Sequence, residues 1–257
     1  ALACESGVLC ALMAQKGLTG PKQWLEGMWG ISRVYSQNHN DLTQDSVQAL
    51  RNGLGHCFLG DDLSLKLYPC CKVAHTSIEG ALSLAKEYNL RSEQIEKVEI
   101  WVSQGAYDTV GHPFKIRASP QVDAQFSIPY TVALALTDGQ VTLSGFETER
   151  IHDPHLHSMA EKVSVFVDPE IQDYAANMVN LSTKMKIYTH QGQIFETELD
   201  KCRGNPENPA SEEEIIEKFT ECARYSGIFS ESSINSAVDL ILNIEKNENI
   251  DNIMNLL

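Results

Sequence analysis

The segment LKLYPCCKVAH, residues 65–75, brings two lysines, two adjacent cysteines and a histidine together without an acidic residue. The acid-free stretch covers residues 63–78, although the chain carries 35 acidic and only 20 basic residues. A second acid-free stretch, residues 109–122, carries three basic side chains: His112, Lys115 and Arg117. If both stretches meet at one cleft, they would form a positive pocket suited to a small polycarboxylate. The alternative is that these residues are ordinary exposed cations.

Acid–base chemistry in this block would depend on His75 or Lys66. The unperturbed pKa of histidine, about 6.5, lies near neutral pH and makes His75 a candidate acid or base. Lys66 would stabilise negative charge on a substrate carboxylate. If it is buried beside other cations, Lys66 would instead lose its proton and act as the base. The residues alone do not choose between these roles, and a structural role for His75 at a helix start stays open.

The chain contains seven cysteines, an odd number without a CxxC pair. This usage favours reduced thiols over a disulfide framework. A bond between the adjacent Cys70 and Cys71 would need a strained ring. We therefore interpret these two cysteines as small buried side chains.

A run of histidines, HDPHLH at residues 152–157, contains side chain types that bind zinc. Asp153 and Pro154 fit the cap and the first position of a helix better, so we expect no metal site there. The sequence also lacks the glycine-rich, GxSxG and HExxH patterns that would indicate nucleotide binding, serine hydrolysis or a zinc peptidase.

The net charge limits the partners of the chain. A formal charge of −15 disfavours binding to nucleic acid or to an anionic membrane surface. No apolar run approaches the roughly 20 residues that span a bilayer, and the N-terminus does not resemble a signal peptide. We expect a soluble, cytoplasmic protein.

The elements that position these residues change in character along the chain. Residues 1–17 predict a buried apolar helix that ends at Gly17 and has no capping residue before it, as in a piece of a longer protein. Further helices are expected at residues 21–27 and 43–58. Strands and helices then alternate, and the expected elements are helices at 74–88 and 122–139, strands at 97–103 and 162–169, and a hairpin turning at Gly192.

The chain returns to helix after residue 202. Ser211 and Glu214 form a capping box at the start of one helix, and a second is expected at residues 231–245, before a frayed end. The expected fold class is α+β: an all-helical domain, incomplete in this chain, with an inserted smaller α+β domain. Residues 1–64 and 203–257 would belong to the helical domain, and residues 65–202 would form the α+β domain.

Four blocks in this order resemble the C-terminal part of the MmgE/PrpD family: GVLCALMAQKGLTGPKQWLEG, KLYPCCKVAH, DAQFSIPYTVALALTDGQV and MAEKVSVFVDP. That family includes 2-methylcitrate dehydratase, cis-aconitate decarboxylase and iminodisuccinate epimerase. The resemblance implies homodimers of two-domain subunits. It also implies an active site between the domains that uses no metal or organic cofactor.

The resemblance further implies that Lys66, Cys71 and His75 line the pocket and that His112 lies near a pocket position. We therefore assign Lys66 and His75 as catalytic residues. Substrate binding is assigned to five residues: Cys71, Lys72, His112, Lys115 and Arg117.

Two departures from the family pattern affect the expected function. Many dehydratase-like members read Arg-Gly-Thr-His where this chain has KVAH at residues 72–75, so a hydroxyl beside the histidine is missing. An acidic, histidine-containing motif and a further lysine of the family would precede Ala1. We therefore expect the chain to need an N-terminal helical segment.

The expected function is that of a cofactor-independent hydro-lyase that dehydrates a 2-methylcitrate-like polycarboxylate. The first alternative is decarboxylation of cis-aconitate or epimerisation of an iminodisuccinate-type substrate. The second alternative is a non-catalytic C-terminal fragment that folds or dimerises with a separate N-terminal half.

Overall fold

The computed structural model describes residues 2–25, 27–35, 48, 51–52, 54–56, 60, 63–174 and 179–256. The chain divides into two compact units, Ala1–Asp61 and Asp62–Leu257. Each unit is described by itself below.

The first unit begins with helix α1 (Leu2–Gln15), which ends before Gly17 at a φ of 97°. The helix is confirmed, but its expected burial is wrong, because none of its residues is buried. The expected helix at 21–27 is also wrong: residues 22–25 form turns, and the next helix is α2 (Ile31–Tyr35). Pro21 supplies no backbone N–H and Gly27 has a low helix propensity, so the stretch between them forms turns. The helix expected at 43–58 lies largely outside the described residues.

The second unit contains a four-stranded sheet in the order β2-β1-β3-β4. Its strands are β1 (Ile95–Val102), β2 (Val163–Val167), β3 (Thr183–Thr189) and β4 (Ile194–Leu199). Strand β1 pairs with β2 in parallel and with β3 antiparallel, and β3 and β4 form an antiparallel hairpin. Gly192 turns this hairpin at a φ of 78°, as the sequence predicts.

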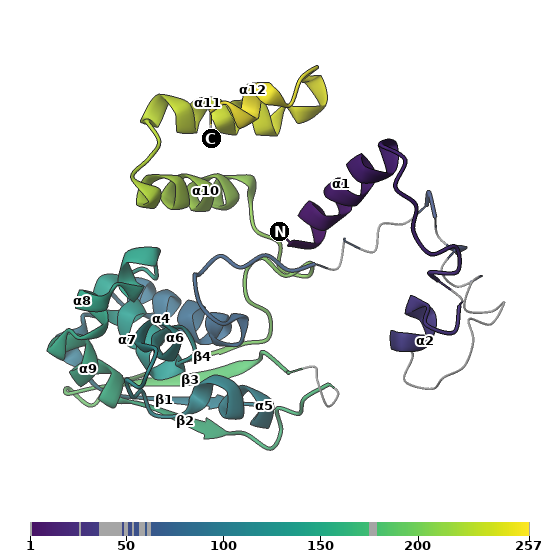
Figure 1. Ribbon diagram of the computed structural model, residues 1–257. Coiled ribbons are helices and arrows are strands. Elements are labelled where there is room, and N and C mark those ends of the chain that lie inside the picture. The colour runs from purple at the N-terminus through teal and green to yellow at the C-terminus, as the bar shows by residue number, and fades with distance from the viewer. Residues whose placement is uncertain are drawn as a thin grey trace. The chain divides into compact units, whose positions relative to one another are not determined.

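Helices α4 (His75–Glu87), α7 (Ile128–Asp138) and α9 (Pro154–Glu161) pack with the sheet (Figure 1). Helix α4 contacts β3 and β4, and a Cβ at Gly80 would lie 3.3 Å from atoms of Thr197 and Leu199. Glycine therefore permits this close approach of helix to sheet. Helix α7 is buried from Ile128 to Leu136 and forms the centre of the core.

The single helix expected at 122–139 is two helices, α6 (Pro120–Gln125) and α7. Ser127 has an extended backbone, and its hydroxyl accepts a hydrogen bond from the Tyr130 N–H at 3.2 Å. Pro129 lies in the first turn of α7, where its missing N–H costs no helical bond. The break therefore follows from a local cap that the apolar pattern conceals.

Short helical segments complete this unit. They are η2 (Lys72–Ala74), η3 (Ser92–Gln94), α5 (Gln104–Ala106), the π-helical turn η4 (Tyr107–Gly111), η5 (Leu143–Phe146) and α8 (Thr148–Ile151).

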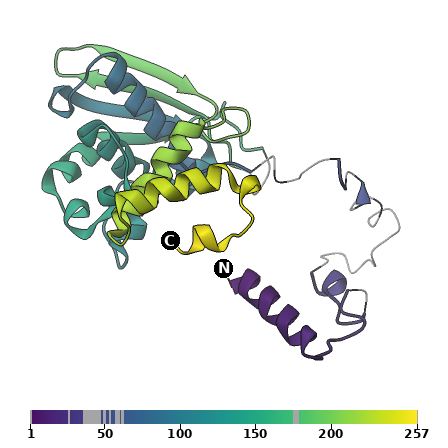
Figure 2. The same cartoon turned by 90° about the horizontal axis from the view of Figure 1, so that it is seen from above.

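The C-terminal helices are α10 (Glu212–Ser226), α11 (Glu231–Leu242), η6 (Ile244–Lys246) and α12 (Asp251–Met254) (Figure 2). The capping box is confirmed, since Ser211 and Glu214 each accept a hydrogen bond from the other's backbone N–H. The frayed end is wrong, because α12 forms there. Among the described residues of α10 only Ala223 is buried, and Ile215 is 44% exposed.

The fold class is α+β, as predicted. The joining of residues 1–64 with 203–257 into one helical domain stays a prediction. In the described part of the chain, no helix is long and apolar enough to cross a membrane.

Candidate functional site

The block at residues 65–75 is held in place by backbone hydrogen bonds from both sides. The Leu65 N–H donates to the Gly204 carbonyl at 2.8 Å, and the Cys71 N–H donates to the Gln125 carbonyl at 2.9 Å. The Gln125 side chain in turn donates to the Pro69 carbonyl at 3.0 Å. The block therefore joins the loop after β4 to helix α6, which the sequence separates widely.

His75 is the first residue of α4 and is fully buried. Among the described residues neither ring nitrogen has a hydrogen-bond partner, and the ring meets Tyr68 edge-on with centroids 5.0 Å apart. Burial is the main cause that lowers the pKa of His75 to about 3, and the charges of Lys72 and Lys66 act in the same direction. The Cys70 backbone acts in the opposite direction, although no hydrogen bond of normal geometry forms. The imidazole is therefore neutral at pH 7.

The charges of three lysines contribute to the lowered pKa of this imidazole: Lys72, Lys66 and Lys218. The Lys72 ammonium donates to the carbonyls of Leu65 at 2.6 Å and Arg203 at 3.2 Å. Lys66 lies exposed on the extended segment before the block turns. The positive cluster predicted from residues 63–78 is thus present around His75.

Lys218 belongs to this cluster, and sequence reasoning missed it. It lies on α10, and its ammonium donates to the Leu67 carbonyl at 3.2 Å. Five acidic residues of α10 surround it in sequence, so no local pattern marks it as part of a positive site. Only the packing of α10 beside the block brings it there.

Glu79 is a second residue that sequence reasoning missed. Its two carboxylate oxygens accept the Arg203 N–H at 2.9 and 3.0 Å. Burial raises the pKa of Glu79 to about 7, although the Arg203 N–H and the Lys72 charge oppose the shift. The only sequence signal is that Glu79 ends the acid-free stretch. It gives the positive cluster a carboxyl that titrates near neutrality.

The two adjacent cysteines differ in environment. Cys70 is buried, and burial raises the pKa of its thiol to about 12. Its Sγ lies 3.7 Å from the Cys71 carbonyl. Cys71 is only half-buried. The interpretation as a buried thiol is therefore confirmed for Cys70 and wrong for Cys71, because the chain turns between them.

The second acid-free stretch reaches the block through its backbone. Segment η2 packs against η4, which directly precedes His112. His112 is exposed and meets Tyr107 edge-on at 5.0 Å, and Lys115 is also exposed. Arg117 is held at Asp123, whose carboxylate accepts the Arg117 N–H at 2.6 Å. The largest charges acting on His75 come from Lys66, Lys72 and Lys218, not from this stretch.

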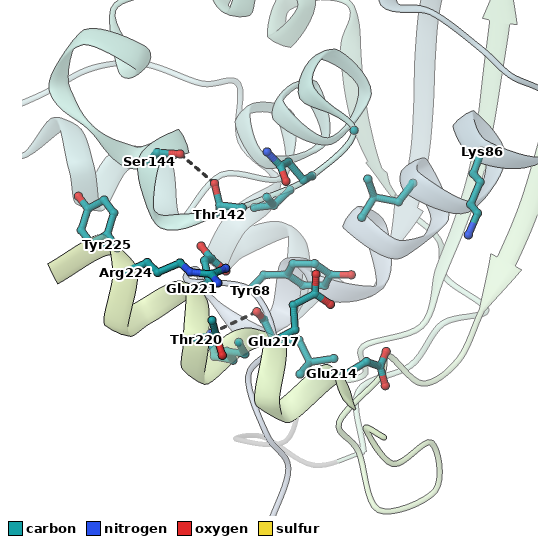
Figure 3. Close-up of a pocket in the computed structure, with 16 residues that line it drawn as sticks. Tyr68, Lys86, Thr142, Ser144, Glu214, Glu217, Thr220, Glu221, Arg224 and Tyr225 are labelled. Carbon is teal, nitrogen blue, oxygen red and sulfur yellow. Dashed lines mark hydrogen bonds between the residues drawn. The ribbon is translucent and has the colours of Figure 1, made fainter. Parts of the chain in front are cut away.

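A groove of about 1070 Å³ lies beside the block (Figure 3). Tyr68 lines it together with α10, which contributes Glu214, Glu217, Lys218 and Arg224. None of the seven predicted site residues lines it. This groove carries both acidic and basic side chains. It is poorly suited to a polycarboxylate, because its glutamate carboxylates would repel the carboxylates of the ligand.

The histidine run forms a helix start, as predicted. Asp153 accepts a hydrogen bond from the His155 N–H at 2.9 Å, and Pro154 follows in the first turn. The His152 and His157 rings contact the carbonyls of Thr148 and Ile151, each at 2.7 Å. Within the ranges that the structure describes, no three His, Cys, Asp or Glu residues gather in a way that could hold a metal ion.

Comparison with known proteins identifies the family of the chain. A sequence model of the MmgE/PrpD C-terminal domain matches residues 68–248. Cis-aconitate decarboxylase from Aspergillus terreus is 24% identical, and the match covers 99% of this chain and 53% of the relative. The Mus musculus cis-aconitate decarboxylase is 22% identical over 99% of this chain and 50% of its own.

A third relative, the cis-aconitate decarboxylase-like protein oryM from Aspergillus oryzae, is 20% identical over 100% of this chain and 53% of its own. The chain thus spans about half the length of the curated relatives it matches. The matched domain covers most of the chain and includes the turn, the cysteines and His75 of the positive block. The chain therefore belongs to the MmgE/PrpD family.

Proposed function

We propose that this chain is part of a lyase that decarboxylates a small polycarboxylate of the cis-aconitate type. The observation that carries the proposal is that relatives named cis-aconitate decarboxylase align with 99% of the chain. The comparisons favour this reaction over the 2-methylcitrate-like dehydration expected from the sequence. The proposed class is therefore a carboxy-lyase rather than a hydro-lyase.

The positive cluster around His75 supports recognition of a polycarboxylate. Lys66 is the exposed member of the cluster and would pair with a substrate carboxylate. The ammonium groups of Lys72 and Lys218 donate hydrogen bonds to backbone carbonyls, and their positive charges still act on His75. A bound anion beside His75 would raise the pKa of its imidazole, because an opposite charge favours the protonated form.

The reaction itself needs a charge sink and a proton. The bond between the substrate carbon and one carboxylate breaks, carbon dioxide leaves, and the electron pair stays on the carbon skeleton. Lysine ammonium groups stabilise the negative charge that develops there. Lys66 or an anion-paired His75 then delivers a proton to the skeleton. Cys71, His112, Lys115 and Arg117 are proposed to shape the pocket around the substrate.

The remaining expectations belong to the same proposal. An N-terminal helical segment would complete the pocket, the subunits would form homodimers, and the protein would be cytoplasmic. The non-catalytic alternative remains a defined competitor, because the chain matches only about half of each relative.

Turnover measurements separate these possibilities. The chain is assayed alone and after co-expression with its upstream segment, with cis-aconitate or 2-methylcitrate as substrate, and carbon dioxide and the products are followed by NMR. We expect decarboxylation of cis-aconitate by the co-expressed form. Dehydration of 2-methylcitrate instead would restore the original expectation, and no turnover of either substrate would favour the non-catalytic alternative.

A substitution tests the role of Lys66. Lys66→Ala should lower kcat/KM by about 100-fold or more, as the loss of a charge-stabilising donor does elsewhere. Lys97→Ala is the matched control, because Lys97 lies on the sheet and pairs with Glu99 at 2.6 Å. Equal activity of both variants would remove Lys66 from the site.

A further inference from the structure

The two edges of the sheet differ sharply in their protection. Edge strand β4 exposes Glu196 and Glu198, and Glu196 pairs with Lys186 at 2.9 Å. Edge strand β2 has the sequence VSVFV, which contains no charge and no proline. Native proteins usually protect an exposed edge with charges, proline or a bulge. Strand β2 has the composition of a strand that pairs.

The backbone of β2 presents free hydrogen-bonding groups at this edge. The Lys162 carbonyl accepts the Val98 N–H at 2.9 Å, and the Asp168 N–H donates to the Val102 carbonyl at 2.9 Å. Both residues thus face β1, and residues of a strand alternate in direction. The backbone N–H and C=O groups of Val163, Val165 and Val167 therefore point away from β1, while the Val163 side chain is buried, and within the described residues these backbone groups have no hydrogen-bond partner.

A groove of about 360 Å³ runs along the same edge. It is lined by four consecutive β2 residues, 163–166, so it follows the strand rather than one face of the sheet. Tyr107, Phe114 and Pro129 form its apolar wall. Phe166 is 43% exposed beside it. The edge thus combines free backbone groups with an apolar channel for side chains of an added strand.

We propose that β2 pairs antiparallel with β2 of a second copy of this chain, about a twofold axis at Val165. In this register Val165 faces Val165 of the second copy, and Val163 faces Val167. These are the three residues whose backbone groups point away from β1, so each pair exchanges both backbone hydrogen bonds. A continuous eight-stranded sheet results, because each copy contributes four strands.

Charge complementarity favours the same register. Lys162 of one copy lies opposite Asp168 of the other at both ends of the paired segment, and Ser164 lies opposite Phe166. No like charges face each other within the paired segment, 162–168. Within one copy, Lys162 donates to the Ile95 carbonyl of β1 at 2.7 Å and Asp168 pairs with Lys184 of β3 at 2.9 Å, so the complementarity across the edge comes from the order of the charges along the strand. A self-pairing of β4 would instead bring glutamates of the two copies together.

This inference rests on the homodimer of the proposed function and names the surface that forms it. Light scattering on the chain over a concentration series should give twice its 28.6 kDa mass. Val165→Pro removes an outward N–H that the β1 ladder does not use, so the variant should become monomeric with an unchanged circular dichroism spectrum. Glu198→Pro is the matched control on β4 and should stay dimeric.

A monomeric wild-type chain, or a Val165→Pro variant that stays dimeric, would overturn the proposal. If Val165→Pro unfolds, cross-linking decides. The exposed Cys4, Cys10 and Cys222 are first replaced by serine. In that background Ser164→Cys with Phe166→Cys should form a covalent dimer under a mild oxidant, whereas Ser164→Cys alone should not. Equal cross-linking of both forms would also overturn it. These experiments measure molecular mass and not turnover, so a negative result would contradict the β2 pairing without affecting the proposed lyase activity.

Discussion

Helices α1 and α7 are both rich in apolar residues, yet α7 is buried and α1 is exposed. Helix α7 is buried from Ile128 to Leu136 between its neighbours in the core. Helix α1 has no buried residue, and Leu2 and Val8 are 78% and 62% exposed. The sequence of an apolar helix therefore predicts that the helix packs against another surface, but it does not show whether that surface is present in the chain.

The largest expected effect comes from opening a cavity in α7. Leu134→Ala should lower the free energy of unfolding by about 2–5 kcal/mol, because a well-packed core collapses only partly around a lost side chain. Leu9→Ala in α1 is the matched control and should change it by about 0.5 kcal/mol or less, because Leu9 is 52% exposed. Urea denaturation measures both. Similar losses would show that α1 is buried in solution.

The next effect is a pH dependence at the buried start of α4. The pKa of His75 is about 3 in the folded chain and about 6.5 when unfolded. The unfolded state therefore binds more protons below pH 6.5, so stability is fully present above that pH and is lost as pH falls towards 3. Between pH 6.5 and 5 the loss should be about 2 kcal/mol.

His75→Gln should flatten this dependence, whereas His190→Gln should retain it, because His190 is exposed in a turn. Urea denaturation at a series of pH values measures the slope. A wild-type slope that His75→Gln leaves unchanged would place the titration elsewhere.

A smaller effect contrasts a buried thiol with an exposed one. Cys70→Ser should lower the free energy of unfolding by about 1–3 kcal/mol, because it buries a hydroxyl in place of a thiol. Cys10→Ser in α1 should have almost no effect, since Cys10 is exposed. Thermal melting compares the two variants. If Cys70→Ser abolishes turnover without lowering the Tm, the thiol has a chemical role.

The smallest effect concerns one hydrogen bond of α7. The buried Tyr130 hydroxyl donates to the Gly145 carbonyl at 2.6 Å. Tyr130→Phe should cost about 1 kcal/mol, the net value of a typical buried bond. Tyr225→Phe on the exposed surface of α10 is the control, and urea denaturation again measures the difference. No loss at Tyr130 would mean that water replaces the phenol.

Local patterns were sufficient for most elements of the second unit. Alternating apolar residues located β1, the capping box located the start of α10, and Gly192 located the hairpin turn. Hydrophobic patterns failed where a single capping residue interrupts a long apolar segment. Ser127 is an example, because it caps α7 and separates it from α6. A cap acts through backbone geometry, which hydropathy does not record.

The candidate site was only partly accessible from the sequence. Lys66 and Lys72 of the acid-free block both contribute to the lowered pKa of His75. Lys218 and Glu79 escaped notice, because packing rather than spacing brings α10 and the Arg203 loop to the block. The roles assigned to the seven predicted site residues stay predictions.

The sequence by itself determined the α+β class, the family and the charge character of the block, because periodicity, motif order and composition are properties of the chain. Only the tertiary structure decided that His75 is buried without a hydrogen-bond partner, that Lys218 joins its cluster and that β2 forms an open edge. Burial and contact depend on which distant segments pack together, so no local pattern can encode them.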